Sequence, residues 1–553
     1  MLSSVVAAVG IILLTATAQT QMAMPQASSE RGTGVAAAPF VRRLDTTPQM
    51  IRGEQHPQIH APLTGVDPAT FALRKARAAH SSAKPKVALP PPARQQSRET
   101  PGAAVLFNAI DEAQCGNVTP ADQAIAVGDT TVGVLQAINV CINVFDKSGN
   151  LQAGYPKSFT SFVGLPASTP TTDPRAIYDW INHRYILAFI QFDRNQASAS
   201  SYWIAVSTGD NPAGGYCLYN LGVQSVAPSG GVFPLPDFPR LGQDRQAIYL
   251  ASNIFNPGYK WEEILVLPKA QMYACAGFGF PVFSDLNVGG VPTDTTQPVN
   301  VFSAGDDPRS EYLVTSFNIN FGGGQCINSC NGLVVWAIHS PLSSPTLNGT
   351  FVATANSYST PPNASQPGGA NTIDTGDTRI SGMAMYNAGS IYASLNTANG
   401  SNSAAILYQI QPFVTAGGAN DGQIASARIL NEFVHGGAFD TYYATQQPDP
   451  EGNVTYAWNF SSSSQFPTLA YSSRRAAQSV GTEPDNGIFV SVSGAFYNQG
   501  RWGDYTAVAP GGLASGAGSG SLPAMYFAGM YARSDGTWGT VIGRNSFNAI
   551  NQP

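Results

Sequence analysis

A short polar signature built around an aspartate recurs along this chain at a nearly constant spacing. Each copy precedes an apolar segment, and several copies carry an arginine two or three positions away, as in TDPRAIYD and PDFPRLGQD. The first interval is shorter than the others, and the aspartates are Asp122, Asp173, Asp237, Asp307, Asp377, Asp440 and Asp504. Self-similarity at a fixed period is the sequence mark of repeat architectures. We therefore expect the chain to be built from structural units of about 65 residues.

Within one period the residue pattern predicts short strands joined by turns. After Asp173 comes an apolar run over 175–178, a polar turn over 179–184, and further apolar runs over 185–192 and 202–207. A sheet of four short strands cannot bury both of its faces alone, so neighbouring sheets must pack around a common axis. This predicts an all-β fold over residues 104–553, a seven-bladed β-propeller. The short first spacing leaves a six-bladed ring with an extra strand pair as the alternative.

The N-terminal region differs from the repeats. An apolar run over 5–14, followed by the small residues Ala16-Thr17-Ala18, predicts a signal peptide over 1–18. Residues 19–103 are rich in Ala, Pro, Gln, Arg and Ser, which predicts a mostly disordered linker or propeptide. Within it, residues 68–77 are expected to form a short helix or a solvated tail. We expect a secreted, periplasmic or cell-surface protein without a membrane span, because no apolar run reaches about 20 residues.

Charge and motif content narrow the possible functions. Only 11% of the residues are charged, the net charge is −6, and no long block of one sign occurs, so nucleic acid is not an expected partner. The sequence has no P-loop, no dinucleotide fingerprint and no HExxH motif, so no cofactor is expected. We expect the protein to be a monomer.

Six cysteines in an exported chain favour disulfides. Cys326 and Cys330 are the best candidate pair, because they would close a small loop, and the pairing of the other four stays open. No histidine lies near this loop or in ligand spacing with another cysteine. We therefore expect no metal site.

Several phrases resemble a largely uncharacterised family of exported, mostly bacterial β-propeller proteins. They are PADQAIAVGDTTVGVLQAINVCINVFDKSGN, DPRAIYDWINHRYILAFIQF, DPEGN with PTLAYSSRR after it, and RWGDYTAVAP, in which RWGDY is the most specific. The expected fold is also similar to that of the sialidase-like propellers. Because the S-x-D-x-G-x-x-W box of those proteins is not clearly present, the resemblance does not imply sialidase activity.

The repeat predicts a polar ring. If each signature aspartate lies where the chain enters an innermost strand, symmetry places these side chains together at one mouth of the central channel. The candidate ligand-binding residues of these units are Asp173, Arg175, Arg240, Asp307, Arg309 and Arg379. An arginine fork matches a carboxylate bidentately, so such a ring suits a carboxylated or polyhydroxylated ligand. The alternative is structural, with each aspartate paired to an arginine of its own or the next unit.

The seventh signature departs from the others. Arg501, Trp502, Asp504 and Tyr505 reverse the order of Asp and Arg and add two aromatic residues around a glycine. Such residues provide flat faces for sugar rings and hydrogen bonds for hydroxyl groups, which favours a ligand site. The alternative is a closure motif where the last unit meets the first.

Two functions remain open at this stage. The first is an exported scaffold that binds an extracellular glycan or a protein partner at the channel mouth. The second is a glycoside hydrolase or polysaccharide lyase, which would need two carboxyl groups at a common cleft, or a tyrosine assisted by one. Two carboxyls free of arginine partners would favour an enzyme, and aspartates all locked in arginine pairs would count against one.

Overall fold

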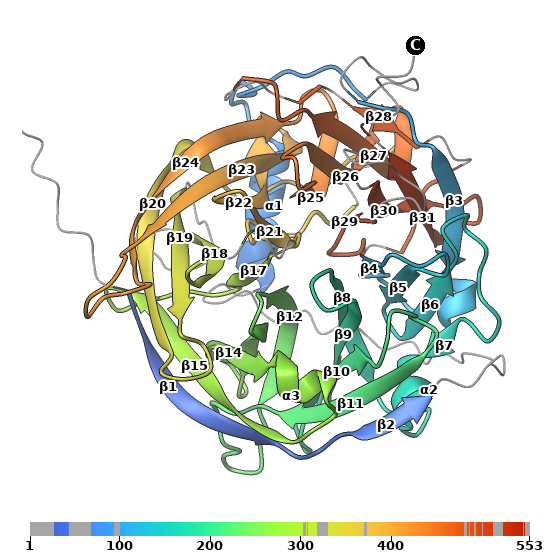
Figure 1. Ribbon diagram of the computed structural model, residues 1–553. Coiled ribbons are helices and arrows are strands. Elements are labelled where there is room, and N and C mark those ends of the chain that lie inside the picture. Colours follow the sequence, from blue (N-terminus) through green and yellow to red (C-terminus); the bar gives the residue numbers. More distant parts are fainter. Residues whose placement is uncertain are drawn as a thin grey trace, which may run out of the picture.

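The computed structural model describes residues 27–43, 68–92, 100–301, 306, 308–317, 330–369, 373–479, 484–485, 487–490, 494–499, 501–511, 524–545 and 547. Figure 1 shows β-sheets arranged in a ring around a central axis. This confirms the all-β class. The predicted signal peptide, Asp307 and Cys326 lie outside the described residues.

The strands form successive antiparallel units in chain order. The first units are β4 (Ala124–Val127), β5 (Val134–Ile138), β6 (Cys141–Phe145) and β7 (Lys157–Ser158); β8 (Thr171–Asp179), β9 (Arg184–Gln191), β10 (Ser201–Ser207) and β11 (Gly215–Gly222); and β12 (Leu235–Gln243), β13 (Ala247–Phe255), β14 (Tyr259–Pro268) and β15 (Phe278–Val288). The next are β17 (Gln297–Val301), β18 (Glu311–Phe317), β19 (Cys330–His339) and β20 (Thr346–Tyr358); and β21 (Ala384–Asn387), β22 (Ser390–Asn399), β23 (Asn402–Val414) and β24 (Ile424–His435).

The ring is completed by strands from both ends of the domain. β25 (Asp440–Pro448), β26 (Val454–Ser462), β27 (Gln465–Arg474) and β28 (Ile488–Phe489) form one unit. In the last unit β29 (Ala507–Pro510), β30 (Met525–Ala532) and β31 (Trp538–Asn545) are joined by β3 (Val105–Asp111), which pairs antiparallel with β31. A strand from before the repeats thus covers the edge of the last sheet, which would otherwise present unpaired backbone groups.

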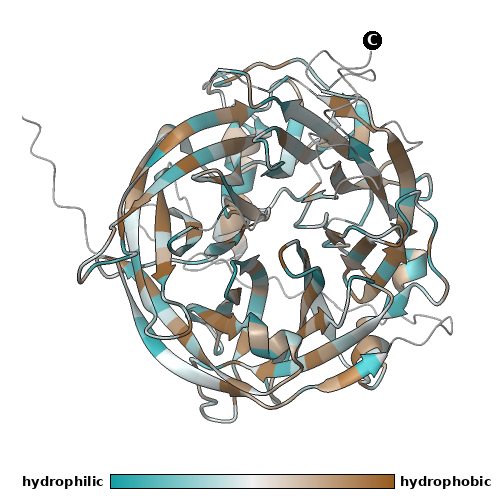
Figure 2. Cartoon of the chain, viewed as in Figure 1, coloured by the Kyte–Doolittle hydropathy of each residue, from teal (hydrophilic) through white to brown (hydrophobic). Residues whose placement is uncertain are grey.

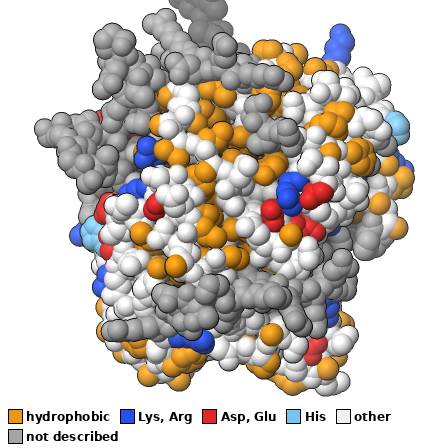
Figure 3. Space-filling model, turned by 90° about the vertical axis from the view of Figure 1, so that its right-hand side faces the viewer, with side chains coloured by type: hydrophobic (Ala, Val, Ile, Leu, Met, Phe, Trp, Pro, Cys, Tyr) orange, Lys and Arg blue, Asp and Glu red, His pale blue; other side chains and the backbone are white. Residues whose placement is uncertain are grey.

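Neighbouring units bury apolar side chains between their faces. Figure 2 shows hydrophobic residues concentrated in the strands and hydrophilic ones in the loops and outermost strands. Phe159, in the short helix α2 (Phe159–Val163), stacks on Phe189 of the next unit at 4.4 Å between ring centres. On the side of the ring seen in Figure 3, charged side chains form small groups of both signs and no broad patch of one sign. The core therefore lies between sheets, and the axis is left to polar residues.

Part of the 19–103 segment is folded onto the ring. β1 (Ala27–Ala36) extends the third unit by pairing with β15, and β2 (Phe40–Arg43) extends the second by pairing with β11. Helix α1 (Pro68–Ala79) covers the stretch predicted as a short helix or solvated tail, and its Lys75 is buried. The prediction of a mostly disordered segment did not anticipate these contacts. Its assignment as a linker or propeptide stays a prediction.

Three short elements complete the description. They are η1 (Ala113–Cys115), α3 (Lys269–Tyr273) and β16 (Val291–Pro292), a small strand paired with β15. Among the residues that the structure describes, no helix has the length and apolar character needed to cross a membrane.

Candidate functional site

Innermost strands of several units begin with a bulge that carries the signature residues. Asp122, Asp173, Phe238 and Tyr443 have φ values of 43°, 55°, 53° and 52°. The register of β8, β12 and β25 shifts at these points. A bulge leaves one residue unpaired and changes the direction of its neighbours' side chains.

An asparagine of the preceding unit holds each of three bulges in place. Asn139 Oδ1 accepts the backbone N–H of Asp173 at 2.8 Å. In the same way, Asn253 Oδ1 accepts the N–H of Thr295 at 3.0 Å, and Asn396 Oδ1 accepts that of Tyr443 at 2.9 Å. Each of these asparagines follows the signature aspartate of its own unit at a similar interval along the chain, a recurring signal that was not among the predicted features. The repeated polar residues therefore serve partly to join neighbouring units.

The signature side chains of different units meet at the axis. We call the following residues the channel-mouth cluster: Asp122, Asp173, Arg175, Asp237, Arg379, Arg501, Asp504 and Tyr505. Asp122 Oδ1 accepts the N–H of Asp504 at 2.7 Å, and Asp173 Oδ2 accepts the N–H of Phe238 at 3.1 Å. The guanidinium carbon of Arg175 lies 3.3 Å from the centre of the Tyr505 ring, a cation–π contact.

Two of the predicted arginines have structural partners. Arg175 Nε donates to the carbonyl of Pro239 at 2.7 Å, and Arg240 Nε donates to that of Thr296 at 2.8 Å. Each arginine thus binds the backbone of the next unit, just after its bulge. Both are buried, and Arg240 also lies 3.6 Å from the buried Glu262. Both arginines therefore join neighbouring units through carbonyl oxygens, and not through the aspartate pairs of the structural alternative.

Two aspartates are paired with arginines in the predicted way. Arg379 Nε lies 2.7 Å from Asp377 Oδ2, and Arg501 Nη2 lies 2.9 Å from Asp504 Oδ2. Arg379 is also 4.6 Å from the centre of the Phe238 ring. The guanidinium groups of Arg379 and Arg501 are therefore each held against a carboxylate.

Asp173 and Asp237 carry no arginine ion pair among the described residues. Asp173 accepts the Thr172 hydroxyl at 2.8 Å, and no side-chain hydrogen bond joins Asp237 to another described residue. Burial raises the pKa of Asp237 to about 7, with a further upward contribution from Asp173 and an opposing one from Arg379. Burial also raises the pKa of Asp173. The mouth thus contains a carboxyl group that changes charge near neutral pH.

Asp122 is more deeply enclosed. Its pKa is raised well above the usual range, first by burial and then by the negative charges of Asp504 and Asp173. Its carboxyl accepts the Asn139 amide at 2.7 Å as well as the N–H of Asp504. This side chain therefore joins the last unit to the first.

The RWGDY segment is mainly a closure motif. Trp502 is fully buried and packs against Tyr497 and Tyr442 at 4.9 and 6.2 Å between ring centres. A Cβ atom on Gly503 would lie 3.0 Å from the Asp122 nitrogen and 2.7 Å from the Met530 sulfur, so the chain passes too closely for a side chain. The prediction that Trp502 and Tyr505 offer faces to sugar rings is not supported, because both are buried.

The fourth signature is out of register. Arg309 lies in the turn after β17, at the end of that strand away from the mouth, and pairs with Asp421 at 2.7 Å. The equivalent bulge residue of this unit is Thr295, which precedes β17 and has φ 56°. DDPR was predicted to be the signature of this unit, although TDTTQPVNV before it contains the matching apolar strand. Arg309 is therefore not part of the channel mouth.

Helix α1 reaches the edge of the cluster. Lys75 Nζ lies 3.3 Å from Asp374 Oδ1 and donates to Thr375 Oγ1 at 3.0 Å. Asp374 lies 3.8 Å from Arg501 Nη1. Burial lowers the pKa of Lys75, and the charge of Asp374 opposes this shift. The N-terminal segment is thus anchored beside the mouth.

The structure decides part of the cysteine pairing that the sequence left open. Disulfides join Cys115 to Cys141 and Cys217 to Cys275. Cys330 is also disulfide-bonded, and because Cys326 is outside the described residues the Cys326–Cys330 pair stays a prediction.

A serine, a histidine and an aspartate do meet away from the mouth. Ser310 Oγ lies 3.2 Å from His339 Nδ1, and His339 Nε2 lies 3.4 Å from Asp421 Oδ2. In a hydrolytic triad the serine faces Nε2 and the acid faces Nδ1, which is the reverse order. Ser310 is also buried and donates its hydroxyl to the Gly422 carbonyl at 2.7 Å. This group does not provide an activated serine.

Comparison with known proteins gives distant likenesses only. No protein-family model matches the chain, and no curated protein matches it. An exo-β-1,3-galactanase from Phanerochaete chrysosporium is 14% identical, with 65% of this chain and 80% of that chain covered and a TM-score of 0.29. A Hadza microbial sialidase is 12% identical, with 64% and 65% covered and a TM-score of 0.32. A family 43 endo-arabinanase from Bacillus licheniformis is 13% identical, with 55% and 97% covered and a TM-score of 0.26. Likenesses at this level assign no function to this chain.

Proposed function

We propose that the chain is an exported, monomeric seven-bladed β-propeller that binds an extracellular glycan at its channel mouth. The antiparallel units described above are taken as the blades, with β3 completing the seventh. The disulfides support a location outside the reducing cytoplasm. The proposal keeps the binding function predicted from the sequence and changes the residues that carry it.

The observation that carries the proposal is the set of partly exposed polar groups at the mouth. Asp173, Asp237, Arg379, Arg501 and Asp504 each keep part of their surface open, whereas Arg175, Arg240, Trp502 and Tyr505 are buried. Carboxylates accept hydrogen bonds and guanidinium groups donate them. Alternating acceptors and donors from several units can satisfy the hydroxyl groups of a sugar.

A glycan array with the full chain tests this proposal. Asp237→Asn and Arg379→Ala should each weaken binding of the best glycan at least tenfold. Arg309→Ala is the matched control, because Arg309 is exposed and ion-paired but lies at the other end of its strand. Asp237 becomes negatively charged as the pH rises through about 7. The affinity of wild type for the glycan should therefore change between pH 6 and 8, and that of Asp237→Asn should change less. Equal binding by Asp237→Asn, Arg379→Ala and wild type would refute the glycan site, and binding of proteins alone would favour the protein-partner alternative.

Glycoside hydrolysis is a second candidate, favoured by one observation. Asp173 lies close enough to Asp237 for its charge to raise the pKa of Asp237, and neither is locked in an arginine pair among the described residues. A carboxyl group with a pKa of about 7 is protonated often enough near neutral pH to act as a general acid, and a neighbouring carboxylate can act as a base or nucleophile.

Release of reducing sugar from a polysaccharide panel separates the two candidates. An enzyme should lose about 10²-fold or more of its rate in Asp237→Asn and in Asp173→Asn, since general acid–base groups contribute on that scale. Turnover by both variants at the wild-type rate would exclude these two residues from catalysis, and binding without any turnover would leave the scaffold function.

A further inference from the structure

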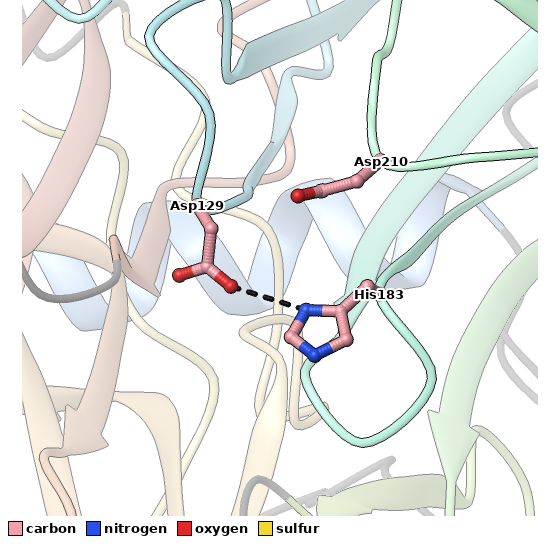
Figure 4. Close-up of side chains that lie close together, drawn as sticks. All are labelled: Asp129, His183 and Asp210. Carbon is pink, nitrogen blue, oxygen red and sulfur yellow. Dashed lines mark ion pairs between the residues drawn. The ribbon is translucent and has the colours of Figure 1, made fainter. Parts of the chain in front are cut away.

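Asp129, His183 and Asp210 form a second polar cluster (Figure 4). They lie in three turns, between β4 and β5, between β8 and β9, and between β10 and β11. β8 runs from the mouth, at Asp173, to Asp179 beside the His183 turn, a distance of about 20 Å at 3.3 Å per residue. The cluster is therefore at the opposite end of the strands from the channel mouth.

The three side chains point toward one another. His183 Nδ1 lies 3.1 Å from Asp129 Oδ2. One ligand atom from each of the three residues lies within 4.8 Å of the other two. Tyr178 donates its hydroxyl to Asp210 Oδ1 and lies 3.3 Å from His183 Nδ1. Tyr178 thus orients the Asp210 carboxylate through Oδ1, and no hydrogen bond to Oδ2 comes from another described residue.

The charge balance favours a cation. Two carboxylates from different units approach each other, and no lysine or arginine forms an ion pair with either among the described residues. Lys147 lies nearby, but its Nζ donates to the carbonyl oxygens of Asp129 at 2.9 Å and Gly511 at 3.2 Å. A divalent cation would offset the repulsion more completely than this single ammonium group.

The ligand set suits a transition metal. Imidazole is a ligand of zinc and its neighbours, whereas magnesium and calcium prefer oxygen alone. In a tetrahedral zinc site with bonds of about 2.0–2.1 Å, ligand atoms are about 3.3 Å apart. The His183–Asp129 separation of 3.1 Å is already close to this value, and a ligand atom of Asp210 lies within 4.8 Å of both.

We propose that Asp129, His183 and Asp210 bind a divalent transition-metal ion, Zn²⁺ in the first instance, that links the first two units of the ring. The fourth position would be open to water. The sequence predicted no metal site. These three ligands come from separate turns of two units and have no motif spacing by which the sequence could reveal them. This site does not depend on the proposed glycan function.

Calorimetry tests the proposal. The full chain is first treated with a chelator and is then titrated with Zn²⁺ alone. We expect one site per chain, and at least a tenfold loss of affinity in both His183→Ala and Asp210→Asn. His339→Ala is the matched control. His339 also lies 3.4 Å from an aspartate, Asp421, but no second carboxylate among the described residues completes a three-ligand group with it. Co²⁺ in place of Zn²⁺ should give a visible absorption band that is absent in His183→Ala.

Three outcomes would overturn the inference. One is an unchanged Zn²⁺ affinity in His183→Ala, and another is an equal loss in His339→Ala. The third is Ca²⁺ binding that matches Zn²⁺ and survives removal of His183, since that would indicate an oxygen-only site. Circular dichroism of each variant checks that the substitution leaves the fold intact.

Discussion

His435 is a buried imidazole without a hydrogen-bond partner among the described residues, which makes the stability of the ring depend on pH. The residue ends β24, both ring nitrogens lack partners there, and the ring packs on Trp458 at 4.2 Å between ring centres. Burial lowers the pKa of His435 to about 4 from its usual 6.5. Between these values the unfolded chain binds more protons than the folded one, so folding becomes less favourable as the pH falls. The expected loss relative to pH 7.5 is about 2 kcal/mol at pH 5 and about 3 kcal/mol at pH 4.

Urea unfolding of wild type and His435→Leu between pH 7.5 and 4 measures this term. The free energy of unfolding of the variant, minus that of wild type, should rise by about 2–3 kcal/mol as the pH falls, because leucine has no proton to bind. Phe439→Leu is the control, since Phe439 lies beside His435 and does not titrate. Its difference from wild type should stay constant with pH. A constant difference for His435→Leu as well would refute the assignment of a buried neutral imidazole.

Three further predictions follow from the closure of the ring and its N-terminal attachments. Trp502→Ala should lower the free energy of unfolding by about 3–5 kcal/mol, as expected for a fully buried aromatic side chain, and an effect below about 1 kcal/mol in urea melts would contradict its burial. Replacing Cys115 and Cys141 by alanine should cost about 3.5 kcal/mol, because the disulfide closes a loop with a sequence separation of 26, and unchanged urea midpoints with and without reductant would argue against that bond. Lys75→Ala should expose helix α1 to protease, because Asp374 and Thr375 lose their contact with Nζ, and cleavage at the wild-type rate would show that α1 is held by other contacts.

The strands and much of their order could be predicted from the sequence. The predicted runs over 185–192 and 202–207 match β9 and β10, because apolar runs bounded by turn residues depend on local patterning. The pairing of β3 with β31 was not predicted, since these strands lie at opposite ends of the domain sequence and neither carries a local signal for the other. The attachment of β1 and β2 to sheet edges was missed for the same reason.

The candidate site was predicted in outline and corrected in detail. Asp173 and Arg379 lie near enough to Asp504 to interact with it electrostatically, and Arg501 is paired with Asp504, but the ligand-binding role of these residues stays a prediction. Asp237, which has no arginine ion pair among the described residues, was recognised as a signature residue but was not selected for the site. Its environment depends on groups from neighbouring units, which no spacing within its own unit reveals.

The sequence by itself determined that this chain repeats, that its repeats are β-strands, and that several repeats deliver polar residues to the start of an inner strand. These properties are local, because hydrophobic period, turn residues and spacing are all read within one unit. Only the tertiary structure decided which polar residues face the mouth. Trp502 was buried in a core cluster that the first, sixth and last units share. Asp129, His183 and Asp210 met because two units place their turns side by side. Contacts between units depend on their relative placement, which a single repeat does not encode.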